Sequence, residues 1–232
     1  MTALAEFPVA ARWPAADPAV LQLYSFPTPN GVKVSIMLEE TGLAYEAHLV
    51  DIRTGDQKSW AFLSLNPNGK IPAILDPDGL EARPLALFES GAILVWLAEK
   101  TGQLMPADPS LRQETLQWLM FQMGGIGPMF GQLGWFTTGD GKVIDDPRPR
   151  DRYRAEAARL LRVLEGRMAG RDWIMGEYSI ADIGILPWLR TLRDFYKAGA
   201  ETGWDDLRHV PAWLDRFLAR PAVQRGLEVP RR

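Results

Sequence analysis

Residues 66–76 of this 232-residue chain read Asn66-Pro67-Asn68-Gly69-Lys70-Ile71-Pro72-Ala73-Ile74-Leu75-Asp76. The first four residues combine asparagine, proline and glycine, which predicts a turn. Residues 73–76 predict a short strand, and residues 84–88 predict another, joined to the first through the Asp78-Gly79 turn. Directly after them, Glu89-Ser90 opens a helix that carries apolar residues on one side and ends near Gly102.

The residues upstream of this segment predict two further strands and two helices. Residues 21–25 form the first predicted strand. A strand cannot continue through residues 26–31, because proline lacks an amide donor and glycine favours turns. Helical spacing follows over residues 32–41 and ends at Gly42, residues 45–50 alternate like a strand, and residues 56–63 form a weaker helical region. The predicted order is therefore βαβαββα.

The remainder of the chain has no convincing strand pattern. Prolines at 106 and 109 predict a linker, and residues 111–123 and 150–168 have amphipathic helical spacing. Ser179-Ile180-Ala181-Asp182 is a capping box ahead of an apolar helix. We therefore expect an irregular N-terminal arm over residues 1–19, an α/β domain over 20–104 and an all-helical domain over 110–232.

Composition restricts the possible functions. A net charge of −3 gives no broad attraction for nucleic acid or anionic membranes. The apolar stretches are far short of the roughly 18 residues that span a bilayer, and the N-terminal residues lack signal-peptide features, so we expect a cytoplasmic protein. The chain has no cysteine and only two separated histidines, His48 and His209, so we expect no metal site. Sulfur chemistry would require a thiol from a ligand.

Five motifs together resemble glutathione transferases in their order and spacing. They are Thr28-Pro29-Asn30-Gly31, residues 66–72, residues 88–93, the glycine-rich residues 124–132, and residues 179–182. The first and fourth motifs look most like the bacterial nu class. The resemblance covers about residues 20–225. It implies a thioredoxin-like first domain, a homodimer, and glutathione-dependent reduction of disulfides with weaker peroxide reduction and transfer of glutathione to electrophiles.

The resemblance also implies a glutathione site, whose groups must match two carboxylates, an ammonium, a peptide backbone and a thiol. Ser90 lies at a predicted helix start, where its hydroxyl, the amides and the helix dipole favour the γ-glutamyl carboxylate. Glu89 supplies an acceptor for the ligand's ammonium. The alternative for Ser90 is an ordinary helix N-cap.

Four more residues are expected to contribute to binding the rest of the tripeptide. The resemblance implies a cis Ile71-Pro72 bond that presents the Ile71 amide and carbonyl to the cysteinyl backbone, the alternative being a trans proline in a turn. Gln57 and Lys70 are expected to bind the glycyl carboxylate, although such residues more often lie on the surface without a ligand.

The partners of the thiol are the most important candidates. Asn30 and Thr28 lie at the start of the first helix, where their polar groups could hydrogen-bond a thiolate and lower a pKa that is about 8.5 in free cysteine. Alternatively, both residues cap the helix or shape the turn. Tyr24 and Ser25 resemble residues that activate the thiol in other classes, but Tyr24 lies in the predicted strand and is expected in the core.

Outside the first domain, Arg152 resembles a nu-class arginine that would bind a carboxylate of a second glutathione or of the substrate, unless it is a solvated helix charge. Three aromatic residues, Phe130, Trp135 and Phe136, could line the electrophile pocket or pack in the core. Asp182 resembles the helix-capping residue of the family. The alternative functions are a conventional conjugating transferase and a non-catalytic binding or dimerisation protein.

Overall fold

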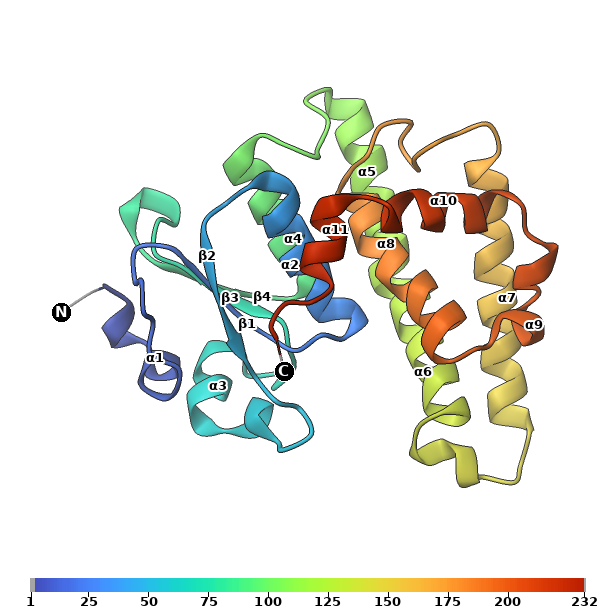
Figure 1. Cartoon of the computed structure of the whole chain (residues 1–232), viewed down its shortest axis with the longest axis horizontal. Helices are drawn as coiled ribbons and strands as arrows, with labels where there is room; N and C mark the ends of the chain where they lie inside the picture. Colours follow the sequence, from blue (N-terminus) through green and yellow to red (C-terminus); the bar gives the residue numbers. More distant parts are fainter. Residues whose placement is uncertain (1–2, 232) are drawn as a thin grey trace. The chain divides into compact units, whose positions relative to one another are not determined.

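The computed structural model describes residues 3–231 of the chain (Figure 1). They form two compact units, which are described separately. One unit contains the residues up to 103 together with those from 221 onward, and the other contains residues 104–220.

The first unit is built around a four-stranded mixed sheet. Its elements follow the predicted order: β1 (Leu21–Ser25), α2 (Pro29–Thr41), β2 (Tyr45–Leu49), α3 (Trp60–Leu65), β3 (Ala73–Asp76), β4 (Leu85–Phe88) and α4 (Ser90–Thr101). The strands lie in the order β2-β1-β3-β4, with β1 parallel to β2 and antiparallel to β3, and β3 antiparallel to β4. Helices α2 and α4 cover one face and α3 the other (Figure 1). The expected thioredoxin-like fold is confirmed.

Strand β1 is the centre of this unit. Its five residues are all buried, since helices cover both faces of the sheet. Tyr24 is almost fully buried and stacks on His48 with the ring centroids 4.7 Å apart, which confirms that it belongs to the core. Burial and the charge of Glu46 raise the pKa of the Tyr24 hydroxyl, so this group does not readily become a base.

Helix α2 begins earlier than its spacing predicted. The spacing predicted a helix from residue 32, but Pro29–Gly31 already form the first helical turn. The reason is local: Thr28 caps the helix, and proline is tolerated at the first helical position because an amide there has no intrahelical acceptor.

The N-terminal arm is not irregular, contrary to expectation. It contains a 3₁₀ turn (Ala3–Glu6) and helix α1 (Pro8–Arg12), which packs against α3. Leu4 and Val9 are buried in the same cluster as Tyr24, so the arm contributes to the core of the first unit. Burial of these apolar side chains stabilises the ordered arm.

The end of the chain also differs from the expected domain division, because residues from 221 onward join the first unit. Helix α11 (Pro221–Gly226) packs against α2, and the Ser35 hydroxyl donates to the Gly226 carbonyl oxygen at 2.6 Å. A Cβ on Gly226 would lie 2.6 Å from the Ile36 Cα, so only glycine permits this approach. The expectation that 110–232 form one domain is wrong for this last segment.

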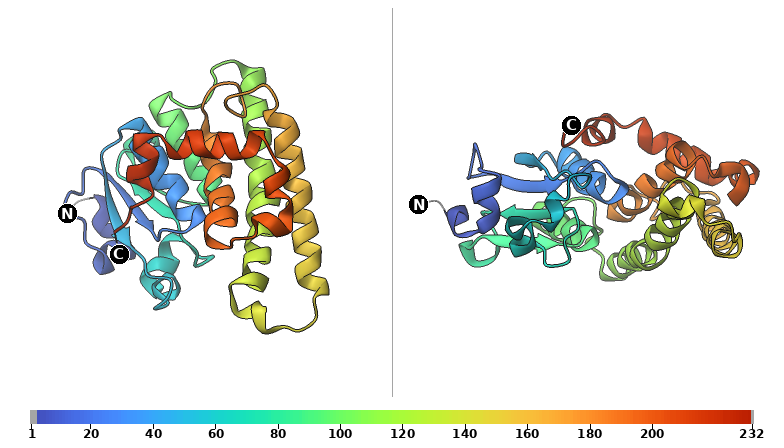
Figure 2. Two further views of the ribbon diagram at one scale, coloured as in Figure 1. Left: turned by 45° about the vertical axis from the view of Figure 1, so that its right-hand side comes forward. Right: turned by 90° about the horizontal axis from the view of Figure 1, so that it is seen from below.

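The second unit is all helical, as expected. Its main helices are α5 (Pro109–Phe121), α6 (Gly127–Thr137), α7 (Arg148–Met168), α8 (Ile180–Arg190) and α10 (His209–Leu218), with the short α9 (Gly199–Thr202). Helices α6 and α7 run side by side (Figure 2). Within residues 3–231, no helix combines the length and apolar composition needed to cross a bilayer.

Asp182 organises the start of α8. Its carboxylate accepts hydrogen bonds from the Ser179 amide at 2.9 Å, the Ile174 amide at 3.0 Å and the Trp213 indole at 2.9 Å, and the Ser179 side chain completes the predicted capping box. Burial raises the pKa of Asp182 to about 6, although these donors favour the charged form. All its partners are structural, which confirms its role in helix capping.

Candidate glutathione site

The first turn of α2 places Thr28 and Asn30 next to β1. The Thr28 hydroxyl oxygen accepts from the Gly31 amide at 3.2 Å, so the capping alternative is correct for this residue. A hydroxyl that accepts one bond keeps its own hydrogen for donation, so capping is compatible with a thiolate contact. A Cβ on Gly31 would lie 2.0 Å from the Phe26 carbonyl oxygen, and glycine is therefore required for this tight connection.

A buried lysine joins the starts of two helices. Lys33 Nζ lies 2.8 Å from Asn30 Oδ1 and 3.3 Å from Ser90 Oγ. These contacts bring together two of the expected site residues, one on α2 and the other on α4. We did not identify Lys33 from the sequence, although its spacing of three from Asn30 places both side chains on the same helical face.

The charge of Lys33 is strongly perturbed. The side chain is completely buried. Burial lowers the pKa of the ammonium to about 7, while the negative charge of Glu89 acts in the opposite direction. Lys33 therefore loses its proton more readily than an exposed lysine.

Glu89 and Ser90 form the start of α4, but Ser90 is not the N-cap. The N-cap position belongs to Glu89, and Ser90 is the first helical residue. Ser90 is buried, whereas the Glu89 side chain is exposed. Glu89 has φ 74° and ψ 111°, a backbone conformation that L-residues rarely adopt and that costs on the order of 1–3 kcal/mol. Such strain is typical of functional sites.

The turn that precedes β3 is organised by Asn66. Its Nδ2 donates to the Lys70 carbonyl oxygen at 2.6 Å, and its Oδ1 accepts from the Asn68 amide at 3.0 Å. The Ile71–Pro72 peptide bond is cis, as the resemblance implied. Pro72 is buried, Ile71 is half-buried and Lys70 is exposed.

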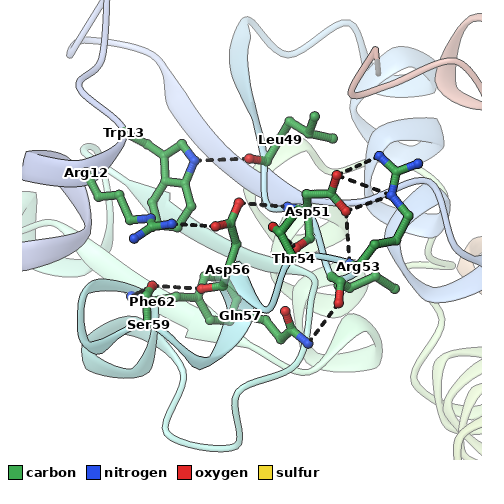
Figure 3. Close-up of polar contacts among 11 residues, drawn as sticks. Arg12, Trp13, Leu49, Asp51, Arg53, Thr54, Asp56, Gln57, Ser59 and Phe62 are labelled. Atoms are coloured by element: carbon green, nitrogen blue, oxygen red, sulfur yellow. Dashed lines mark hydrogen bonds and ion pairs between the residues drawn. The ribbon is translucent and has the colours of Figure 1, made fainter.

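Gln57 lies in a short 3₁₀ turn (Asp56–Lys58) after β2 (Figure 3). Its Nε2 donates to the Ile52 carbonyl oxygen at 3.4 Å. Its Oε1 is buried and accepts no hydrogen bond from any residue between 3 and 231. An uncompensated buried polar atom is costly and indicates a position that a ligand can satisfy.

The remaining candidates belong to the second unit. Arg152 is exposed on α7, and its charge adds to the hydrogen bond and charge of Arg159 in lowering the pKa of Glu156. Phe130 is fully buried and therefore part of the core. Trp135 is partly exposed and packs edge to face against Phe136, with the ring centroids 4.6 Å apart. A ligand contact of Arg152 stays a prediction.

The family assignment follows from comparisons with known proteins. The family model described as "Glutathione S-transferase, N-terminal domain" matches residues 28–100, and "Glutathione S-transferase, C-terminal domain" matches residues 141–221. The chain belongs to the glutathione S-transferase family. The first match contains Thr28, Asn30, Gln57, residues 70–72 and Glu89-Ser90, and the second contains Arg152.

Individual members of the glutathione S-transferase family are similar over nearly the whole chain. Disulfide-bond oxidoreductase YfcG of Escherichia coli is 42% identical over 219 residues, covering 90% of this chain and 94% of the relative. A glutathione transferase of Burkholderia graminis, solved with two glutathione molecules per subunit, has a TM-score of 0.98 and 62% identity, covering 100% of this chain and 97% of that one.

A second solved structure has a different ligand. The glutathione transferase of Pseudomonas putida was solved with one glutathione disulfide per subunit, and it has a TM-score of 0.97 and 60% identity. The match covers 98% of this chain and 99% of the P. putida chain.

Proposed function

We propose that this family member is a glutathione-dependent disulfide reductase of the nu class, acting as a homodimer, in which bound glutathione supplies the attacking thiolate. The observation that carries the proposal is the pair of contacts from Lys33, which brings Asn30 at the start of α2 and Ser90 at the start of α4 within reach of one ammonium. Helix starts provide unsatisfied amide donors and positive dipole ends, both of which favour anionic ligand groups.

Each part of glutathione has an assigned partner in the proposal. The γ-glutamyl carboxylate binds at Ser90 and its ammonium at Glu89, the cysteinyl backbone binds at Ile71 beside Pro72, the glycyl carboxylate binds Gln57 and Lys70, and the thiolate accepts hydrogen bonds from Asn30 and Thr28. Arg152 binds a carboxylate of the second glutathione or of the substrate. Hydrogen bonds to the charged form of the thiol lower its pKa.

The reaction then needs no thiol from the protein, whose sequence contains no cysteine. The glutathione thiolate attacks one sulfur of the substrate disulfide, forms a mixed disulfide and releases one substrate thiolate, which takes up a proton. A second glutathione thiolate attacks the glutathione sulfur of the mixed disulfide, releasing the other substrate thiol and forming glutathione disulfide. The protein contributes positioning and electrostatic stabilisation.

The relatives support this choice within the family. YfcG and YghU of E. coli, at 42% and 41% identity, are both named disulfide-bond oxidoreductases. The two ligand sets in the B. graminis and P. putida structures, two glutathiones and one glutathione disulfide, are the reduced and oxidised ligands that the proposed reaction interconverts.

The test compares two reactions of the purified protein with glutathione: reduction of a model disulfide, followed through glutathione disulfide formation, and conjugation of a model aryl halide. We expect disulfide reduction to be the faster reaction at saturating glutathione. Faster conjugation would identify a conventional transferase instead. Absence of both activities, with glutathione binding retained in calorimetry, would favour the non-catalytic alternative.

A further inference from the structure

Lys33 brings the starts of α2 and α4 together, but it has no role of its own in the proposed reaction. Lysine is almost never fully buried unless it is paired, because its ammonium loses hydration. Lys33 is fully buried, and its contacts include side chains from two different helices. Both of these side chains, Asn30 and Ser90, are assigned to glutathione in the proposed function.

The contact with Asn30 determines how its carboxamide is oriented. The Asn30 atom 2.8 Å from Lys33 Nζ is the carbonyl oxygen, the only branch of the carboxamide that can accept a hydrogen bond from an ammonium. The NH₂ group is on the other branch of the planar amide. Without the lysine, the amide could turn over and present its oxygen to the ligand sulfur, which would repel a thiolate.

The contact with Ser90 also leaves a donor group for the ligand. The Ser90 hydroxyl oxygen lies 3.3 Å from Lys33 Nζ and accepts its hydrogen bond. A hydroxyl that accepts from an ammonium retains its own hydrogen as a donor. Donation is what a ligand carboxylate requires.

We propose that Lys33 is a positioning residue that couples the thiol end and the γ-glutamyl end of the glutathione site, by holding Asn30 and Ser90 as donors toward the ligand. This inference rests on the proposed function. A disturbance of either residue is transmitted through Lys33 to the other. In the proposed site the positive charge of protonated Lys33 lies one side chain away from the thiolate and from the γ-glutamyl carboxylate, and it favours both.

The test is a double-mutant cycle on glutathione affinity, measured by calorimetry. Asn30→Ala removes a direct contact and also disturbs Ser90 through Lys33, and Ser90→Ala does the converse. The double variant loses both direct contacts, but has no second site residue left to disturb. We therefore expect its loss of affinity to be smaller than the product of the single losses by at least about threefold.

The same cycle in the Lys33→Met background should be additive, because the connecting side chain is gone. Methionine keeps a long unbranched chain without donors or charge. Additive losses in the wild-type background, or equal non-additivity in both backgrounds, would overturn the inference while leaving the proposed function intact. If neither single substitution changes affinity or turnover, both the inference and the proposed site are wrong.

A second readout separates positioning from a merely structural role. The ultraviolet absorbance of the bound thiolate, followed against pH, reports the pKa of the glutathione thiol in the complex. Lys33→Met should raise this pKa by about one unit or more, because it removes a nearby positive charge and the restraint on Asn30. Lys33→Arg, which keeps charge and donors, should restore part of the shift.

Ser35→Ala is the matched control for both measurements. Ser35 is buried on the same helix and bonds the Gly226 carbonyl oxygen, so its loss perturbs α2 without removing a proposed ligand contact. It should leave the thiol pKa and the coupling unchanged. An equal change in both properties with Ser35→Ala would show that Lys33 acts only through the general stability of α2.

Discussion

Arg12 forms an ion pair with Asp56, the residue that directly precedes Gln57 (Figure 3). The neighbouring Trp13 indole donates to the Leu49 carbonyl oxygen at 3.0 Å, and Asp56 also accepts from the Asp51 amide at 3.1 Å. The N-terminal arm therefore contacts the last residue of β2 through Trp13 and the loop after β2 through Arg12. In the proposed function this loop presents Gln57 to the glycyl end of glutathione.

The first prediction concerns this support. Arg12→Ala should raise the KM for glutathione about two- to fivefold, the range expected for loss of an exposed ion pair, and leave kcat unchanged because the thiol end is untouched. Steady-state kinetics with varied glutathione provide the measurement. Arg225→Ala is the matched control, since Arg225 forms a comparable exposed ion pair with Glu39 at 2.6 Å and neither residue has a ligand contact in the proposal. An unchanged KM for Arg12→Ala would show that the N-terminal arm does not contribute to glutathione binding.

The second prediction concerns the γ-glutamyl end. Ser90→Ala should weaken glutathione binding by about 1–3 kcal/mol, because a buried carboxylate contact loses its hydroxyl donor. Calorimetry measures the affinity, and circular dichroism should show an intact fold. The control is Ser64→Ala, which removes an exposed hydroxyl bonded to the Ala61 carbonyl oxygen at 2.7 Å. Unchanged affinity for Ser90→Ala would remove Ser90 from the site.

The third prediction concerns the thiol end. Replacing Thr28 and Asn30 together with alanine should lower kcat more than it weakens glutathione binding, since the lost hydrogen bonds stabilise developing charge on sulfur. Turnover at saturating glutathione is compared with the calorimetric dissociation constant. Normal turnover at saturation, combined with weaker binding, would mean that these residues only position the ligand.

The fourth prediction follows from the buried lysine and concerns the protein without ligand. The pKa of Lys33 falls from about 10.5 in the unfolded chain to about 7 in the folded protein, so the unfolded chain binds more protons between these values. The free energy of unfolding should therefore rise with pH in this window, by up to about 1.4 kcal/mol per unit from this group.

Lys33→Met removes that dependence. The variant should be more stable than wild type near neutral pH, and its advantage should shrink as the pH rises toward about 9, as measured by urea unfolding. Ser35→Ala neither adds nor removes an ionisable group, so the difference in its free energy of unfolding from wild type should not vary with pH. A constant difference for Lys33→Met as well would contradict the lowered pKa.

The fifth prediction follows from the absence of cysteine. Treatment with a thiol-alkylating reagent, followed by its removal, should leave disulfide reduction intact, and intact-protein mass spectrometry during turnover should show no covalent glutathione adduct. Dithiothreitol should not replace glutathione, because a simple dithiol lacks the carboxylates and ammonium that the site binds. Equal catalysed rates with the two reductants, after subtraction of the uncatalysed reaction, would rule out the proposed site.

Local sequence signals were sufficient for much of the fold. The strands of the first unit, the Gly42 helix end and the Ser179–Asp182 capping box depend on neighbours in the chain, because turns, caps and periodic burial act over a few residues. The family motifs added Asn30, Ser90 and the cis bond at Ile71–Pro72 as expectations.

Contacts between residues distant in the chain were decided only by the tertiary structure. Leu4 and Val9 are buried in a cluster with residues of α3 and the sheet, which lie far along the chain. Gly226 meets α2 after 190 intervening residues. Lys33 looks like an ordinary helix lysine in the sequence, yet the packing of α2 against α4 buries it between Asn30 and Ser90. Burial and pairing of a charge depend on which surfaces meet, and a linear pattern of residues does not specify that.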